Sequence, residues 1–272
     1  MCFKLVSGPS PNLWLGQFDI FPKEIFVHGI STRHGGVSGQ PWSSLNLGLH
    51  VWDKAEDVIE NRQLFCSSLG INGEKAVTCQ QVHGEQIARV TAEKRGAGFR
   101  DIADAVPETD ALITNEPDVP LMLFFADCTP ILLADPVRRA VGLAHGGWKG
   151  TLRSIAAKTV AAMQREFGCR PENMLAAIGP SIGSCCYQVG SEVAAQFEAA
   201  FPGFASQILL KEADNIRLDL QRANTLQLQE AGLRASNIAA SHVCTACNNS
   251  QFFSYRADKG KTGRIAAIIG VK

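Results

Sequence analysis

Short apolar runs of strand length recur along the chain, and helical patterns interrupt them without strict alternation. The runs that indicate strands are 24–30, 110–114, 121–126, 131–134, 140–145, 174–178, 236–243 and 264–271. Strands and helices mixed in this way favour two or more packed layers around one core. The sequence therefore predicts a layered α/β or α+β fold with mixed sheets.

Helical periodicity marks four further segments. Residues 53–69 carry an imperfect apolar face that ends at Gly70, and a second helix is expected to start near Thr151 and stop at Gly168. The other two helices are expected at 191–200 and 219–231. Residues 91–108 are charged and contain glycine, which predicts a long surface excursion. No convincing linker divides the chain, so we expect one domain over residues 1–272.

The composition excludes several classes of partner. The 272 residues include 26 basic and 26 acidic side chains, so the formal net charge is zero and indicates no binding to nucleic acid or to an anionic membrane. No apolar run is long enough to span a bilayer, and no secretory signal is visible. Nine cysteines lie without the dense spacing of a secreted disulfide framework. We therefore expect a reduced, cytoplasmic protein.

Three residues with metal-binding chemistry stand at the ends of apolar runs. His83 follows the run 76–79, while Cys128 and His145 follow the runs at 121–125 and 140–144. We expect them to meet, because parallel-type sheets gather functional groups at the carboxyl ends of their strands. Two imidazoles and a thiolate suit Zn²⁺, and three protein ligands leave one position open for chemistry.

Two of these residues also belong to turns with other interpretations. The segment from His145 to Thr151 joins a strand to a helix through Gly146 and Gly147, and with Lys149 it predicts an anion-binding turn. An ordinary tight turn explains it equally well. Pro130 places Cys128 at a rigid corner, where its thiol could bind metal, act as a nucleophile or simply be buried.

The remaining candidates are cysteine pairs and loop residues. Cys185–Cys186 and Cys244–Cys247 are interpreted as separate structural cysteines, because neither pair is accompanied by a second pair nearby in sequence. Zinc nucleobase deaminases have a similar Cys-x-x-Cys, but Val243 stands where their proline belongs. Polar residues in or beside loops complete the set: Arg33, Asn46, Asn61, Arg62, Arg256 and Arg264.

Ordered motifs along nearly the whole chain resemble those of the YfiH-type laccase-domain family, also described as purine nucleoside phosphorylases or polyphenol oxidases. The matching segments begin at residues 31–38 (STRHGGVS), 44–48 (SLNLG), 60–62 (ENR) and 81–84 (QVHG). They continue with 126–130 (ADCTP), 145–151 (HGGWKGT), 178–183 (IGPSIG), 186–190 (CYQVG) and 253–256 (FSYR). The combination is specific to that family.

The resemblance implies a single α/β/β/α domain that binds zinc through His83, Cys128 and His145. It implies phosphorolysis of adenosine, inosine, guanosine or methylthioadenosine, and deamination of adenosine. Asn46 and Arg62 match positions that line the family's nucleoside site. We therefore expect Asn46 to bind the nucleoside and Arg62 to stabilise phosphate or the leaving group, with Arg33, Gly146, Gly147, Lys149 and Arg256 as further substrate- or anion-binding residues.

Three alternatives remain open. Six histidines without a His-x-His pair argue against a multicopper centre, but a single Cu²⁺ in the zinc site could give polyphenol oxidase activity. Cys128 could instead be the nucleophile of a hydrolase or amidase that edits cell-wall peptides, with His83 or His145 as base. The protein could also bind nucleosides without turnover. We expect a monomer or homodimer.

Overall fold

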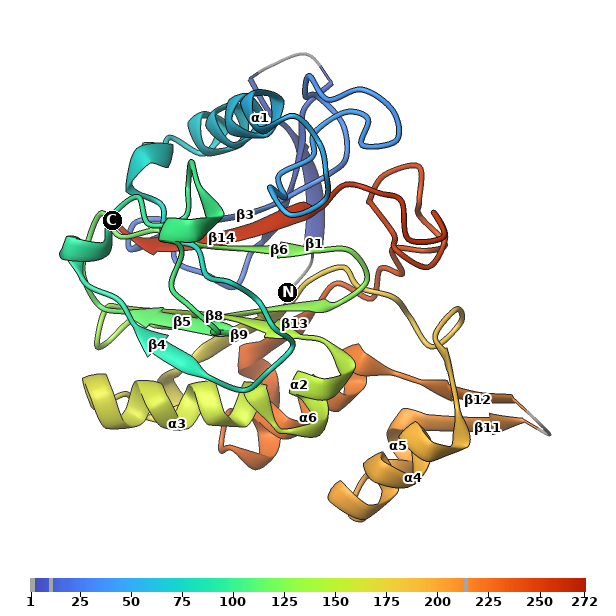
Figure 1. Ribbon diagram of the computed structural model, residues 1–272. Coiled ribbons are helices and arrows are strands. Elements are labelled where there is room, and N and C mark those ends of the chain that lie inside the picture. Colours follow the sequence, from blue (N-terminus) through green and yellow to red (C-terminus); the bar gives the residue numbers. More distant parts are fainter. Residues whose placement is uncertain (1–2, 10–11, 213–214) are drawn as a thin grey trace.

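Two sheets stacked face to face form the centre of the computed structural model, which describes residues 3–9, 12–212 and 215–272 (Figure 1). One sheet has the order β1-β2-β3-β14-β6 and the other the order β13-β9-β7-β8-β5-β4. Helix α1 covers the outer face of the first sheet, and α3 and α6 cover that of the second (Figure 1). Parallel and antiparallel pairs occur together in the second sheet. The predicted layered α/β/β/α fold with mixed sheets is confirmed.

The elements have the following bounds. The helices are α1 Ala55–Ser68, α2 Trp148–Leu152, α3 Ile155–Phe167, α4 Ser191–Ala200, α5 Ala205–Ile208 and α6 Leu220–Glu230. The strands of the first sheet are β1 Phe3–Ser7, β2 Trp14–Phe18, β3 Phe26–Ser31, β6 Leu121–Phe125 and β14 Ile265–Val271. Those of the second are β4 Ile87–Arg89, β5 Ala111–Thr114, β7 Thr129–Asp135, β8 Ala140–Gly146, β9 Leu175–Ile178 and β13 Ile238–Ala240. A third, small sheet contains β10 Gln188–Val189, β11 Leu209–Glu212 and β12 Asn215–Leu218.

Three apolar layers hold these elements together. Every residue of β6, β7, β8 and β14 is buried, because these strands are covered on both faces. Leu123 and Leu143 belong to the layer between the two sheets, Phe65 of α1 to the layer above, and Val160 of α3 to the layer below. A strand covered on both faces reads as a continuous apolar run, which is why the sequence predicted these strands well.

Two expected elements differ from the structure. The helix expected from Thr151 is two helices, α2 and α3, separated by Ser154 in a left-handed conformation with φ of 61°. The run 76–79 forms only isolated bridges, from Val77 to Leu121 and from Cys79 to Val106. The excursion 91–108 contains no β-strand, yet it buries Phe99 completely against the core.

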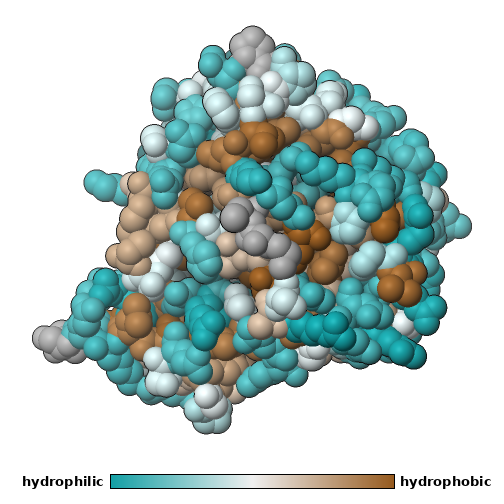
Figure 2. Space-filling model, turned by 180° about the vertical axis from the view of Figure 1, so that it is seen from behind, coloured by the Kyte–Doolittle hydropathy of each residue, from teal (hydrophilic) through white to brown (hydrophobic). Residues whose placement is uncertain are grey.

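The third sheet lies to one side with α4 and α5 (Figure 1). This part has its own apolar cluster, which includes Phe197, Ile208 and Leu218. On the face opposite to Figure 1, apolar areas alternate with hydrophilic ones (Figure 2). None of the helices in the described part of the chain is both long and apolar enough to pass through a bilayer.

Candidate metal centre and adjoining cavity

The structure brings the side chains of His83, Cys128 and His145 together. Their ligand atoms all lie within 4.8 Å of one another, and Cys128 Sγ is 3.8 Å from His83 Nε2. The two imidazole rings meet edge to face, with centroids 4.8 Å apart. Two nitrogens and one sulfur at this separation are a donor set that fits a zinc ion with an open position.

Antiparallel pairing, rather than a row of parallel carboxyl ends, produces this convergence. Cys128 lies in the link where the chain leaves β6 of the first sheet and enters β7 of the second. Strand β7 runs antiparallel to β8, so the residues that start β7 lie beside the end of β8, with Pro130 opposite His145. His83 lies before β4, which reaches the same edge through β5. The expected meeting is confirmed, but the expected reason for it is wrong.

Asp110, immediately before β5, forms hydrogen bonds with both histidine segments of the centre. Its Oδ1 accepts a hydrogen bond of 2.8 Å from Nδ1 of His145, which leaves Nε2 of that ring for a ligand. The same carboxylate accepts hydrogen bonds from the backbone N–H groups of Val82, His83 and Gly84, at 3.2, 3.0 and 2.6 Å. A carboxylate that fixes a histidine in this way is the usual outer support of a metal-binding imidazole.

The charges of the centre reinforce one another. Burial acts to raise the pKa of the Cys128 thiol, but the charge and hydrogen bond of His145 overcome it and lower that pKa to about 6. Burial acts to lower the pKa of His145, but Cys128 and Asp110 raise it to about 9. Both shifts favour the thiolate form of Cys128, which is the form that binds metal and that attacks electrophiles.

A cavity of about 550 Å³ opens onto the centre. Beyond the three ligand residues, its walls are aromatic, apolar and basic. They are formed by His50, Gln81, Phe124, Ala126, Asp127, Trp148, Ile182, Tyr187, Tyr255, Arg256 and Arg264. A cavity with aromatic walls and a few polar groups is typical of a small-molecule site.

Two arginines enter the cavity wall from the C-terminal segment. The guanidinium of Arg256 lies 5.4 Å from the ring of Tyr187, and that of Arg264 lies 5.9 Å from the ring of Tyr255. Asp127 fixes Arg256 by accepting its backbone N–H at 2.7 Å. Each of the two tyrosine rings is thus paired with a cation that lines the same cavity.

Arg62 and Asn46 lie outside this cavity, contrary to the expected contacts with substrate. The Arg62 guanidinium is buried and donates to the carbonyls of Leu47, Gly98 and Phe99 at 2.6 to 2.8 Å. It borders a smaller cavity of about 160 Å³ whose lining shares His50, Gln81 and Phe124 with the main one. Asn46 is also buried, and its Oδ1 accepts the backbone N–H of Arg264 at 2.8 Å. Both polar atoms of the Asn46 side chain and two of the three guanidinium nitrogens of Arg62 bind groups within the protein, so both residues support the cavity wall.

The other predicted anion-binding residues divide between the cavity and its surroundings. Arg256 lines it, as expected, but Arg33 donates to Asn249 and does not line it. Lys149 also lies outside its lining, with Nζ 5.6 Å from the Trp148 ring. Gly146 is packed inside β8.

Gly147 has a different role from the expected anion-binding turn. A Cβ atom there would lie 3.0 Å from Cδ2 of His83 and 3.1 Å from Sγ of Cys128. The glycine therefore makes room for the metal ligands.

Sequence reasoning did not single out Asp110, His50, Tyr187 or Tyr255 as site residues. Asp110 had a recognisable signal, because it is an acidic residue at the start of an apolar strand. A carboxylate buried in such a place requires partners. The two tyrosines lie within the matching segments 186–190 and 253–256, but only the fold shows that they line the cavity beside His83, Cys128 and His145.

The sequence of the chain matches one known protein family and several named relatives. Residues 27–272 match the family described as "Multi-copper polyphenol oxidoreductase laccase". Purine nucleoside phosphorylase YlmD of Geobacillus stearothermophilus is 44% identical over 90% of this chain and 89% of its own length. The protein of that name from Bacillus subtilis is 40% identical over 92% of this chain and 90% of its own.

Solved structures agree with the sequence comparison. The structure of YfiH from Bacillus licheniformis, titled a hypothetical protein, superposes with a TM-score of 0.92 at 38% identity, covering 99% of both chains. That of YlmD from Geobacillus stearothermophilus also gives 0.92, at 40% identity and 98% coverage of both chains. The chain therefore belongs to the laccase-domain family of YfiH and YlmD.

Proposed function

We propose that this protein is a zinc-dependent purine nucleoside phosphorylase that acts on adenosine, inosine, guanosine or methylthioadenosine. The observation that carries the proposal is one cavity in which a three-ligand metal centre, two arginines and two tyrosines face a shared space. The names of the YlmD relatives support the same reaction. Phosphate and the nucleoside are thus the expected small-molecule partners.

The cavity residues suit the two halves of this substrate pair. Arg264 donates through one guanidinium nitrogen to the carbonyls of Thr262 and Gly263, both at 3.0 Å, which leaves its other N–H groups for an anion. Arg256 lines the same cavity as a second cation. Tyr187 and Tyr255 offer faces against which a purine can stack. We therefore assign phosphate to the arginines that line the cavity rather than to Arg62.

In phosphorolysis, a phosphate oxygen bonds to C1′ of the ribose while the C1′–N bond breaks with its electron pair on the purine. The sugar passes through a cation-like state, so an oriented phosphate supplies both the nucleophile and nearby negative charge. Zinc held by His83, Cys128 and His145 would act as a Lewis acid toward an oxygen of the ligand. Asp110 keeps the His145 ring oriented for that task.

The test is product analysis with adenosine or inosine, with and without phosphate. We expect free base and ribose 1-phosphate only when phosphate is present, and loss of turnover in His83→Ala. Arg264→Gln is expected to raise the KM for phosphate more than it changes kcat. No free base under any condition would contradict the proposal. Deamination of adenosine, which the same cavity could support with water, would appear as inosine without any need for phosphate.

A hydrolase with Cys128 as nucleophile is the second candidate, because Cys128 Sγ lies 3.8 Å from His83 Nε2 and has a lowered pKa. The hydrolase and the metal site predict different reactivity of Cys128. Zinc would protect Cys128 from iodoacetamide if the thiolate binds metal. An acyl-substrate analogue trapped covalently on Cys128 would favour the hydrolase.

A further inference from the structure

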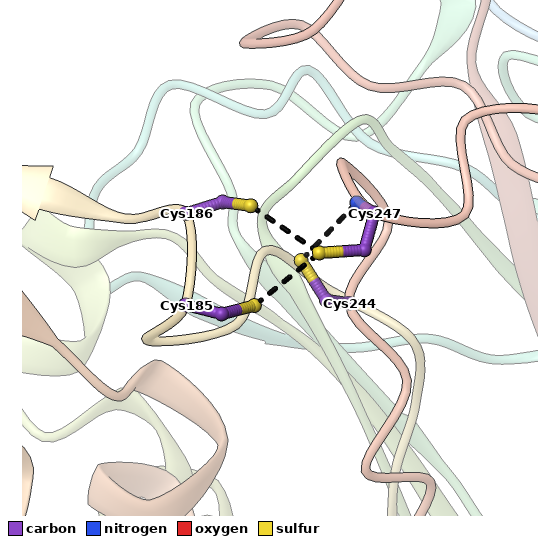
Figure 3. Close-up of side chains that lie close together, drawn as sticks. All are labelled: Cys185, Cys186, Cys244 and Cys247. Atoms are coloured by element: carbon purple, nitrogen blue, oxygen red, sulfur yellow. Dashed lines mark hydrogen bonds between the residues drawn. The ribbon is translucent and has the colours of Figure 1, made fainter.

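Four cysteines from two distant segments meet at a second cluster (Figure 3). Cys247 Sγ lies 3.5 Å from that of Cys185 and 3.4 Å from that of Cys186. Cys244 completes the group, and all four sulfurs lie within 4.8 Å of one another. The expectation that neither pair has a second pair to complete a site is therefore wrong.

The second sheet explains why the pairs meet. Strand β13 lies beside β9 in parallel, with Ala240 opposite Ile178, so the chain leaves both strands at the same edge. The segments stay together beyond the strands, because Ser181 forms a bridge with Cys244. Both cysteine pairs follow their strands within eight residues, since β9 ends at Ile178 and β13 at Ala240. The topology thus supplies the second Cys pair that the linear sequence lacked.

The sulfur geometry fits a metal better than a disulfide. Tetrahedral zinc with Zn–S bonds of about 2.3 Å places its sulfurs about 3.8 Å apart. The 3.4 and 3.5 Å separations around Cys247 are near this value and far from the bond length of about 2.05 Å in a disulfide. Cys247 also stands close to two different thiols at once, whereas a disulfide joins only one pair.

Backbone groups already point at one of the sulfurs. Cys244 Sγ accepts the N–H of Gly183 at 3.2 Å and that of Cys247 at 3.5 Å. Hydrogen bonds of this kind stabilise a thiolate and orient it as a ligand. Cys185 and Cys247 are exposed, so an ion can reach the cluster from solvent.

We propose that Cys185, Cys186, Cys244 and Cys247 bind a second zinc ion as a closed, structural tetrathiolate site. Four protein ligands leave no open position, so this ion does no chemistry on the substrate. Its role is to tie together two loops of the cavity wall. Ile182 and Tyr187 flank the first cysteine pair and line the cavity.

The second loop is bound to the cavity as well. Thr245, inside the Cys244–Cys247 turn, donates to Asp127 at 2.6 Å, and Asp127 lines the cavity beside Cys128. Arg256 donates to the carbonyl of Cys186 at 3.2 Å, which links the arginine of the wall to the first cysteine pair. The second zinc would therefore brace the substrate cavity without touching it.

Zinc content measured by mass spectrometry tests the proposal directly. We expect two zinc ions per chain in the protein purified without chelator. Cys185→Ser and Cys247→Ser should each lose one, and because both residues are exposed their substitution costs little packing. Cys169→Ser, a buried cysteine of neither cluster, should keep both ions.

A second readout separates this site from the catalytic one. With cobalt in place of zinc, Cys247→Ser should lose most of the thiolate-to-metal absorption, while Cys128→Ser should lose only a small part of it. The inference does not depend on the proposed reaction, because Cys128→Ser is expected to lose only the other ion. Unchanged zinc content and cobalt spectrum in Cys185→Ser and Cys247→Ser, or a stable disulfide among the four cysteines in the purified protein, would overturn it.

Discussion

Asp110 shows how one buried carboxylate can set the geometry of a metal centre. It is fully buried and binds both histidine segments, one through a side chain and the other through three backbone N–H groups. Burial acts to raise the pKa of Asp110, but its hydrogen bond with His145 and its backbone donors lower that pKa overall. The carboxylate is therefore the form that the site holds.

Replacing Asp110 by asparagine should weaken metal binding without removing a ligand. The amide nitrogen would face a hydrogen-bond donor, so the His145 ring loses its fixed orientation. We expect zinc affinity to fall about 10- to 100-fold, measured by competition with a chromophoric chelator. Asp135→Asn is the matched control. Asp135 is as buried as Asp110, but it is the last residue of β7, whereas Cys128 precedes the first. Equal affinities in the two variants would contradict the role of Asp110.

His28 should make the stability of the protein depend on pH. Burial lowers its pKa from 6.5 to about 4, and its Nε2 accepts the backbone N–H of Phe18 at 2.9 Å. Between these pH values the unfolded chain binds a proton that the folded chain excludes, so stability falls as pH falls. We expect a loss of about 3 kcal/mol from pH 6.5 to 4, measured by urea unfolding.

His28→Gln is the control for this effect, because it keeps an acceptor but cannot titrate in that range. Its free energy of unfolding should fall less steeply with pH than that of the wild type. Identical slopes for the two proteins would exclude His28 as the source.

At the scale of elements, the start of α2 is packed closely against the candidate metal ligands His83 and Cys128. Gly147 has φ of −69° and ψ of 167°, values that alanine adopts easily, so any cost of a side chain comes from crowding alone. We expect Gly147→Ala to push His83 and Cys128 apart at a cost of about 1–3 kcal/mol. Zinc affinity measured by chelator competition should fall about tenfold or more.

Gly190 offers a close control for that substitution. It precedes α4 with φ of −75° and ψ of 161°, and a Cβ atom there would meet nothing within 4 Å. Gly190→Ala should leave zinc affinity and activity unchanged. A similar loss in both variants would show that helix starts in general, rather than the ligands, tolerate no side chain.

The elements also show which parts of the fold the sequence could reveal. Strands buried on both faces, such as β8 and β14, were predicted because their apolar runs are continuous. Strands β1 and β2 were missed, because β1 (FKLVS) has no fully buried residue and β2 (WLGQF) is short and interrupted by Gly16. The prediction of a single helix from Thr151 was wrong for a local reason. Nothing in the apolar periodicity indicates that Ser154 adopts a left-handed conformation and separates two helices.

The candidate site could be predicted only in part for a related reason. Histidine and cysteine have distinctive metal-binding chemistry, so residue type and strand ends were enough to predict that His83, Cys128 and His145 come together. The motif of Arg62 does not reveal that three backbone carbonyls accept hydrogen bonds from two of its guanidinium nitrogens and that the residue lies outside the main cavity. The four-cysteine cluster needed the parallel alignment of β9 and β13, which no spacing along the chain could supply.

At the scale of the whole molecule, both proposed metal sites join segments that are far apart in sequence. Metal removal should therefore lower the melting temperature. An ion at 100 times its dissociation constant contributes about 2.7 kcal/mol. At about 2–4 °C per kcal/mol for a chain of this size class, we expect a chelator to lower the melting temperature by about 5–10 °C for each site. Scanning calorimetry with and without added zinc measures the shift.

Variants separate the two contributions to this shift. In Cys247→Ser the chelator-induced shift should fall by the share of the proposed four-cysteine site, and in His83→Ala by that of the proposed centre of His83, Cys128 and His145. A melting temperature unaffected by chelation in the wild type would contradict a stabilising metal at either site.

X-ray diffraction at the zinc absorption edge, on crystals of protein purified without chelator, tests the central claim most directly. The account predicts an anomalous peak about 2.0–2.3 Å from Nε2 of His83, Sγ of Cys128 and Nε2 of His145. No peak among these three side chains, in crystals whose protein turns over nucleoside, would contradict it.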